Sequence, residues 1–205
     1  MTIQLSQDEI LRRGLDAFAE LGYDAASVRE LGRRIGVNHN FINDRYGSKL
    51  DFWRTVVDYA IAELGHDDQP EPDDPALALS HRVHALFRTA AQRPQLYRLV
   101  WDEASRDTER LDYLFERYLR PAVDETLPTV KRAAPEGARI PVDLLYFVLT
   151  GAISGIVQEP LARRLGRTTS AGSSNDARTA VADALASYVL SGLNGEATQP
   201  RTLLP

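Results

Sequence analysis

The chain has 205 residues, of which 43% are hydrophobic, and this is ample for the buried core of one or two globular domains. It has no cysteine, which excludes disulfides, thiolate-bound zinc and a cysteine nucleophile. The net charge of −5 argues, as an average, against a nucleic-acid partner, yet residues 28–54 carry six basic side chains against three acidic ones.

No segment has the features of a signal peptide or of a transmembrane helix. The N-terminus, MTIQLSQDEILRR, lacks a basic start followed by an apolar run. The most apolar stretch, residues 144–157, is shorter than the ~20 residues that span a bilayer. We therefore expect a cytoplasmic protein.

The first 65 residues are predicted to form short helices. Ser6, Ser27 and Ser48 each stand three residues before a carboxylate, an arrangement that satisfies free N–H groups where a helix begins. Apolar residues at helical spacing predict a first helix over roughly residues 7–21, which Gly22 ends.

A helix, a glycine turn and another helix come next. The second helix begins after Ser27 and ends at Gly36. Asn38 can cap a third helix, which turns Phe41 or Ile42 inward. Two helices joined by a short turn with glycine are typical of the helix-turn-helix motif.

The rest of the chain is also predicted to be helical. A long helix follows Ser48, and the acidic, proline-rich residues 65–75 then separate two halves. Further helices are expected over 76–92, 95–107, 110–134 with a bend before Pro121, 142–165 and 176–193. Residues 166–175 are predicted to form a mobile loop. No segment has the period of a strand, so we predict an all-α protein.

Residues 17–57 read AFAELGYDAASVRELGRRIGVNHNFINDRYGSKLDFWRTVV. They combine a Gly-Tyr turn, a helix start at Ser27, the Gly36-Val pair, an aromatic residue at Tyr46 and the Ser48-Lys49 pair. This combination resembles the tetracycline-repressor (TetR) family of bacterial transcription regulators, whereas the C-terminal half is only loosely similar to that family.

The resemblance implies a helix-turn-helix DNA-binding domain over residues 1–50. It implies a helical effector-binding and dimerisation domain over residues 51–205. A homodimer would bind a palindromic DNA operator and repress transcription until a small molecule releases it. The predicted DNA-binding residues are Ser27, Arg29, Asn38, His39, Asn40, Phe41, Asn43, Asp44, Arg45 and Lys49.

The polar residues of the third helix are the predicted reading surface. If Ile42 and Tyr46 point into the core, the outer face consists of His39, Asn40, Asn43 and Asp44. Amides there can pair with adenine edges, and the alternative is a merely solvated face. Lys49 opens the fourth helix, where it can meet a backbone phosphate.

Two features depart from the family pattern. Phe41, Ile42 and Asn43 stand where the family commonly has a small residue, a leucine and a phosphate-contacting tyrosine, so that phosphate contact is expected to be missing. Asp44 places a negative charge toward a polyanion. This costs affinity unless Arg45 or His39 offsets the charge, or unless the carboxylate accepts from a cytosine amino group.

The later helices carry two further patterns. Aromatic residues are predicted to line an effector pocket or to pack the core: Phe87, Tyr97, Trp101, Tyr113, Tyr118 and Tyr146. Small residues in the last two long helices predict a four-helix dimer interface, unless they pack within one chain: Gly151, Ala152, Ser154, Gly155, Ala180, Ala182, Ala184, Ala186 and Ser187.

Other polar groups do not predict a site. The histidines at 66, 81 and 84 have no third ligand at an obvious spacing, and the carboxylates at 102, 103 and 107 have no nucleophile or phosphate loop beside them. We therefore expect no metal, no cofactor and no catalysis. Two alternatives stay open: a DNA-binding regulator without an effector, and a helical small-molecule-binding protein without DNA binding. An internal cavity or a covered recognition helix would discriminate between them.

Overall fold

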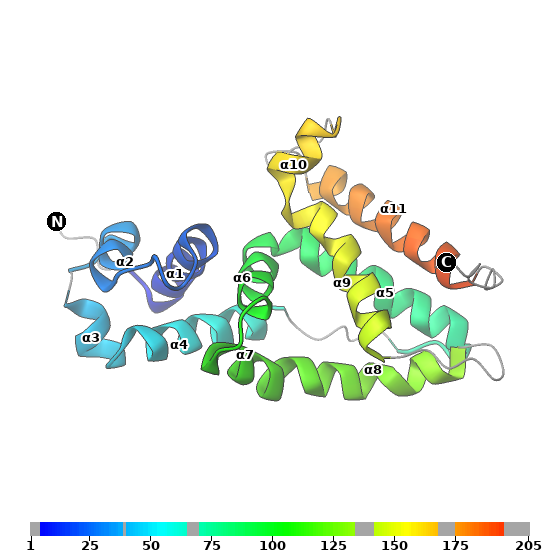
Figure 1. Ribbon diagram of the computed structural model, residues 1–205, viewed down its shortest axis with the longest axis horizontal. Coiled ribbons are helices and arrows are strands. Elements are labelled where there is room, and N and C mark those ends of the chain that lie inside the picture. Colours follow the sequence, from blue (N-terminus) through cyan, green and yellow to red (C-terminus); the bar gives the residue numbers. More distant parts are fainter. Residues whose placement is uncertain (1–4, 39, 65–69, 134–141, 168–174, 195–205) are drawn as a thin grey trace, which may run out of the picture. The chain divides into compact units, whose positions relative to one another are not determined.

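The computed structural model describes residues 5–38, 40–64, 70–133, 142–167 and 175–194 (Figure 1). Every regular element within these residues is helical, so the predicted all-α class is confirmed. The chain divides into two compact units: unit 1 holds residues 1–69 and 93–119, and unit 2 holds residues 70–92 and 120–205. A DNA-binding domain that ends at residue 50 remains a functional prediction.

Unit 1 contains α1 (Gln7–Leu21), α2 (Val28–Ile35), α3 (Phe41–Tyr46), α4 (Lys49–Ala62), α6 (Pro94–Ala104), α7 (Glu109–Leu114) and a π-helical turn, η1 (Phe115–Leu119). The three predicted helix starts are confirmed. The hydroxyls of Ser6, Ser27 and Ser48 each accept from the backbone N–H three residues on, at 3.2, 3.2 and 3.0 Å.

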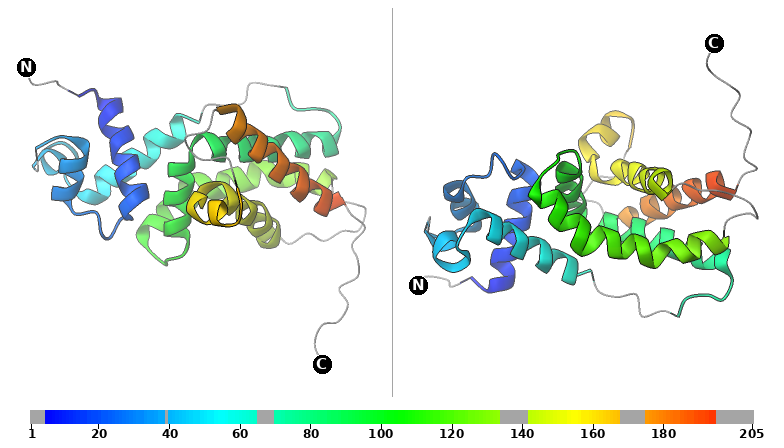
Figure 2. Two further views of the ribbon diagram at one scale, coloured as in Figure 1. Left: turned by 90° about the horizontal axis from the view of Figure 1, so that it is seen from above. Right: turned by 60° about the horizontal axis from the view of Figure 1, so that its bottom comes forward.

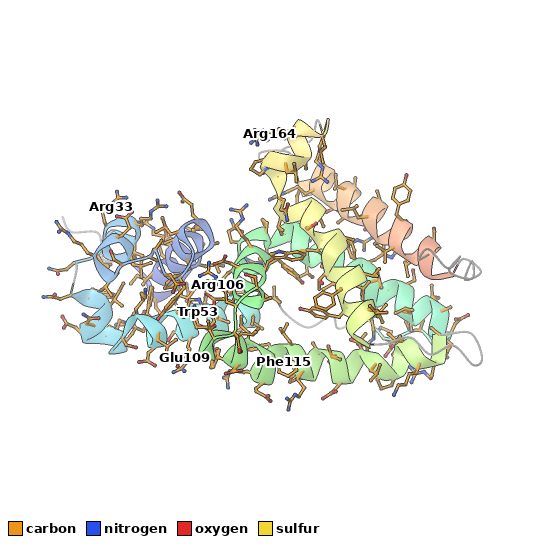
Figure 3. All side chains as sticks on the ribbon, viewed as in Figure 1. Arg33, Trp53, Arg106, Glu109, Phe115 and Arg164 are labelled. Carbon is orange, nitrogen blue, oxygen red and sulfur yellow. The ribbon has the colours of Figure 1, made fainter. Side chains whose placement is uncertain are left out.

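The core of unit 1 centres on the aromatic residues of α4. Phe52 and Trp53 are fully buried, and the ring of Phe52 lies 5.8 Å from that of Phe18 on α1 (Trp53 is labelled in Figure 3). Gly14 permits this close packing, because a Cβ there would lie 2.8 Å from the Phe52 ring. Ile42 of α3 is also fully buried, and its burial sets the rotation of α3.

The corner between α2 and α3 is held by α1. Gly36 ends α2 with φ +87°, a conformation that other residues rarely adopt. The guanidinium of Arg13 donates to the carbonyl oxygen of Ile35 at 2.8 Å and lies so close that a Cβ on Gly36 would approach it to 3.3 Å. The helix-turn-helix corner therefore depends on a contact from outside the motif.

A buried ion pair joins α6 to α7. The guanidinium of Arg110 donates to Glu103 at 2.8 Å, and Glu103 is only 1% exposed. Burial raises the pKa of Glu103, although Arg110 opposes the rise. Arg110 also lies 3.9 Å from the centre of the Tyr23 ring, which follows α1, and so fastens α7 to the turn between α1 and α2.

Unit 2 contains α5 (Pro75–Gln92), α8 (Arg120–Ala133), α9 (Val142–Val157), α10 (Glu159–Arg164) and α11 (Asn175–Asn194). Helix α5 is central, since α8, α9 and α11 all pack against it (Figure 2). Among the described helices, none is both long enough and apolar enough to cross a membrane.

Two predicted helices are interrupted. The helix expected over 142–165 breaks at Gln158 into α9 and α10, and Pro160 follows within the first turn of α10. The helix expected over 110–134 consists of α7, η1 and α8, so the irregular turn lies just before Pro121, where a bend was predicted. The described residues leave out His39, residues 65–69 of the 65–75 segment, and residues 168–174 of the predicted loop.

Candidate nucleic-acid interface

The outer face of α3 consists of short polar side chains. Asn40, Asn43 and Asp44 are exposed, whereas Ile42 is fully buried. Because successive residues of a helix are turned by about 100°, positions 40 and 44 lie nearly opposite position 42, and position 43 is turned about 100° from it. Within the described residues, none of these three side chains forms a hydrogen bond or an ion pair.

The sequence predicted that Asn38 caps the third helix, but the N-cap of α3 is Asn40, without a side-chain cap hydrogen bond, and Asn38 acts in the turn before it. The side-chain oxygen of Asn38 accepts from the backbone N–H of Asn40 at 3.0 Å, and the regular helix begins one residue later, at Phe41. Asn38 is therefore engaged in shaping the turn. His39 lies outside the described residues.

Arg45 does not neutralise Asp44. Its guanidinium donates to the side-chain oxygen of Gln7 at 2.6 Å, at the start of α1. It also lies 5.9 Å from the centre of each ring of Phe41 and Tyr46. Arg45 is thus held against its own unit, and Phe41 is a half-buried packing partner rather than a fully exposed contact residue.

Most of the local positive charge is engaged within the chain. Arg33 and Arg34 both bind Glu30, and together they lower the pKa of that carboxyl to about 2. Arg54 pairs with Asp51 at 3.4 Å. Arg29 differs, because it is exposed and has no partner among the described residues. Figure 3 shows Arg33 on the outer side of α2.

Lys49 is turned toward the body of unit 1. Its ammonium donates to the carbonyl oxygen of Tyr23 at 3.1 Å and lies 4.1 Å from the centre of that ring. Burial lowers its pKa. A DNA phosphate would have to compete with Tyr23 for this ammonium, so Lys49 as a phosphate contact remains a prediction.

A hollow that is open to solvent lies along α2. Its volume is about 360 Å³, and its lining residues are Ser27, Arg29, Glu30, Arg33 and Val37. Two of the predicted DNA-binding residues, Ser27 and Arg29, are on its wall. The hydroxyl of Ser27 already caps α2, which leaves Arg29 as its free cation among the described side chains.

The six aromatic residues predicted for an effector pocket divide between the units. Unit 1 holds Tyr97, Trp101, Tyr113 and Tyr118, and unit 2 holds Phe87 and Tyr146. The structure brings Tyr113 and Tyr118 together, with ring centres 6.2 Å apart. Both hydroxyls donate to Asp58 of α4, a residue that no sequence pattern singled out. Phe87 is fully buried, as a core residue is, whereas Trp101 is 40% exposed.

An exposed stripe runs along α9 and another along α11. The α9 stripe consists of Leu144, Phe147, Val148 and Gly151, which follow each other at helical spacing, and the first three are 58%, 67% and 49% exposed. The α11 stripe consists of Ala180, Ala184, Ser187, Tyr188 and Ser191.

The small residues predicted for a dimer interface separate into two groups. Ala182 and Ala186 are fully buried within unit 2, and a Cβ on Gly155 would touch the side chain of Leu185 at 3.7 Å. These residues pack inside one chain. Gly151 differs, because a Cβ there would meet nothing within 4 Å. Ala180, Ala184 and Ser187 are likewise exposed.

Comparison with known proteins agrees with this geometry. Residues 10–54 match the family described as "Bacterial regulatory proteins, tetR family". By sequence, no curated protein matches the chain. Among solved structures, a member of the TetR transcriptional regulator family from Streptomyces coelicolor is 25% identical, with 94% of each chain covered and a TM-score of 0.69.

Two further solved structures are similar in fold. A putative fatty acid metabolism regulator from Clostridium perfringens is 17% identical, with a TM-score of 0.67. The match covers 90% of this chain and 97% of the Clostridium chain. The TetR family transcriptional regulator PfmR from Thermus thermophilus is 20% identical, with a TM-score of 0.63. The match covers 95% of this chain and 100% of PfmR.

Proposed function

We propose that this chain, which belongs to the tetR family of bacterial regulatory proteins through its N-terminal domain, is a repressor that binds a palindromic operator as a homodimer and leaves it when a small molecule binds. The premise of the proposal is that the chain is a transcription regulator with a helix-turn-helix domain. The repression, the operator, the dimer and the effector are the proposal.

The outer face of α3 carries the proposal. Asn40 and Asn43 are exposed and have no partner within the described residues, and the buried Ile42 turns them outward. Each amide offers one donor and one acceptor side by side, which is the complement of the adenine edge in the major groove. Both side chains are short, so they suit a helix that lies deep in that groove.

The exposed stripes of α9 and α11 support the dimer. Phe147 and Tyr188 are 67% and 79% exposed, which is unusual for side chains of this size on a protein that acts alone. A second copy that places the same stripes against them would bury both. A two-fold axis then relates two copies of α3, and we expect half-sites about 34–36 Å apart or a multiple of this distance.

The proposal that an effector releases the protein from DNA rests on the family resemblance alone. A ligand that binds one arrangement of the dimer more tightly than another must lower the affinity for DNA by the difference. The alternative is a regulator without an effector. It would bind the same operator, and no small molecule would change that affinity.

Selection from a randomised duplex pool tests the proposal. The full chain is incubated with the pool, bound duplexes are amplified, and the enriched sequences are aligned. We expect an inverted repeat with the spacing given above, bound at least ~1,000-fold more tightly than random duplex. No enrichment, or enrichment without a repeat, would overturn the operator and the dimeric mode of binding.

A further inference from the structure

We propose that Asp44 selects a cytosine in each half-site and raises selectivity by repelling the chain from every other sequence. The inference rests on the proposed function, because it assigns a base to one residue of the reading face. Asp44 is the residue of α3 least suited to a polyanion, and the inference gives its carboxylate a function in binding the operator.

Asp44 lies where it must face the groove if α3 enters it. It is exposed, and its position on the helix is nearly opposite to the fully buried Ile42. Asn40, four residues earlier, lies on the same face. A docked α3 therefore cannot present its amides to base edges without also presenting the carboxylate.

The carboxylate keeps its charge available. Within the described residues it forms no ion pair, and the neighbouring Arg45 is bound to Gln7 on α1 instead. Arg33 and Arg34 of α2 are bound to Glu30. Since these cations have other partners, Asp44 offers two unoccupied acceptor oxygens at the surface.

The chemistry of the major groove then selects the base. A carboxylate can only accept, and guanine offers two acceptors there, while thymine offers one acceptor and a methyl group. Adenine offers a donor beside an acceptor. Cytosine alone offers a donor, its N4 amino group, with no acceptor on its own edge. The most favourable base opposite Asp44 is therefore cytosine.

The same carboxylate penalises all other sites. On random duplex it faces mainly acceptors and phosphates and meets a suitable donor only at some positions, so it weakens binding there on average. Replacing Asp44 with asparagine keeps the shape, removes the charge and adds a donor. This variant should bind random duplex more tightly and lose its preference for cytosine.

A purely structural role predicts the opposite. Asp44 lies in the first turn of α3, where a negative charge favours the helix. If that were its only role, Asp44→Asn would lower the melting temperature and weaken binding to operator and random duplex alike. The sign of the change on random duplex separates the two roles.

The test compares three proteins: the wild type, Asp44→Asn and Asp107→Asn. Asp107 is an exposed residue just before α7, and because α3 packs against α2 and α4, the control removes one charge from unit 1 away from the reading face. Each protein selects from the randomised pool. Its affinity is then measured for the wild-type consensus, for each single-base change of that consensus, and for random duplex.

We expect the wild-type consensus to contain one cytosine per half-site whose replacement weakens wild-type binding by roughly 10-fold or more. That penalty should largely disappear in Asp44→Asn, which should bind random duplex about 3- to 10-fold more tightly. Asp107→Asn should behave as the wild type.

Equal penalties at every position in the wild type and Asp44→Asn, or equal affinities for random duplex, would overturn the role of Asp44 while leaving the operator in place. Equal gains in Asp44→Asn and Asp107→Asn would assign the effect to net charge and also overturn it. A wild type that enriches no sequence would overturn the proposed function itself.

Discussion

Two surfaces of this protein are exposed among the described residues, and their chemistry is opposite. The outer face of α3 in unit 1 carries Asn40, Asn43 and Asp44, which are short and polar. The α9 stripe in unit 2 carries Phe147, which is large, apolar and 67% exposed. Both follow from the same helical spacing. The spacing identifies the face, and the residue types indicate what covers it.

A third region, the core of unit 1, shows aromatic residues that are enclosed by their neighbours. Phe52 and Trp53 in unit 1 are fully buried, whereas Phe147 in unit 2 is not, although all three are large aromatic residues. The comparison directs attention to the α9 stripe, where Leu144, Phe147 and Val148 are exposed at helical spacing, because contiguous exposed apolar residues, unlike single ones, mark an interaction site. Five predictions follow from the separation of interior, polar face and apolar stripe, in order of decreasing effect, and the first two concern the interior.

The largest effect is expected in the interior. Arg110→Met removes the cation paired with the buried Glu103 carboxyl and leaves it only the hydroxyl of Thr108 at 3.5 Å, so it should lower the free energy of unfolding by about 3–5 kcal/mol at neutral pH. Urea denaturation measures this. The double variant Glu103→Met with Arg110→Met removes both charges and should recover most of the loss. If the double variant were as unstable as the single one, the ion pair would not be the cause.

The loss in Arg110→Met should depend on pH. Burial already raises the folded-state pKa of Glu103 above its ordinary value of 4.5, and removing Arg110 raises it further. Between 4.5 and the folded value, the folded protein keeps a proton that the unfolded chain has lost. The contribution of Glu103 to stability therefore rises as pH falls through this window, and the deficit of Arg110→Met should shrink as pH falls toward 4.5.

The apolar stripe should give the next largest effect. Phe147→Asp places a charge where a second copy is expected, so it should weaken dimerisation by about 2–4 kcal/mol, or roughly 30- to 1,000-fold. Sedimentation over a range of concentrations measures this. Leu77→Asp is the matched control, because Leu77 is 51% exposed in the same unit but lies on α5. Equal behaviour of the two variants would break the assignment of the stripe.

The polar face should give a smaller effect that appears only on DNA. Asn43→Ala should weaken binding to the selected operator by about 1–3 kcal/mol and leave binding to random duplex nearly unchanged. Gln158→Ala removes an exposed amide from unit 2 and should change neither affinity. If Asn43→Ala left the ratio of operator to random affinity unchanged, the outer face of α3 would be ordinary solvated surface.

The smallest effect is expected at Arg29, the exposed cation of α2 without a partner among the described residues. If it meets one phosphate, Arg29→Ala should reduce the log-log salt slope of binding by roughly 1, on operator and random duplex alike. Arg33→Ala should reduce it less, because Arg33 is bound to Glu30 at 2.6 Å. Equal reductions would indicate that the pairing with Glu30 does not persist on DNA.

The sequence by itself determined the local structure of unit 1. The helix starts at Ser6, Ser27 and Ser48 and the end of α2 at Gly36 were all predicted, because each depends on residues within one or two turns of helix. The rotation of α3 was predicted only in part, since the sequence left Phe41 or Ile42 as the inward residue and the structure buries Ile42 fully. The family resemblance of residues 17–57 also lies in this local pattern.

Only the tertiary structure decided which polar groups remain free. Arg45 is bound to Gln7, a residue 38 positions earlier, and Tyr118 is bound to Asp58, a residue 60 positions earlier. The sequence counted Arg45 and Lys49 among the cations near DNA, and the structure engages both within unit 1. Such pairs form wherever packing brings distant elements together. No pattern within a few residues can therefore predict them, whereas the caps and turns need only their neighbours.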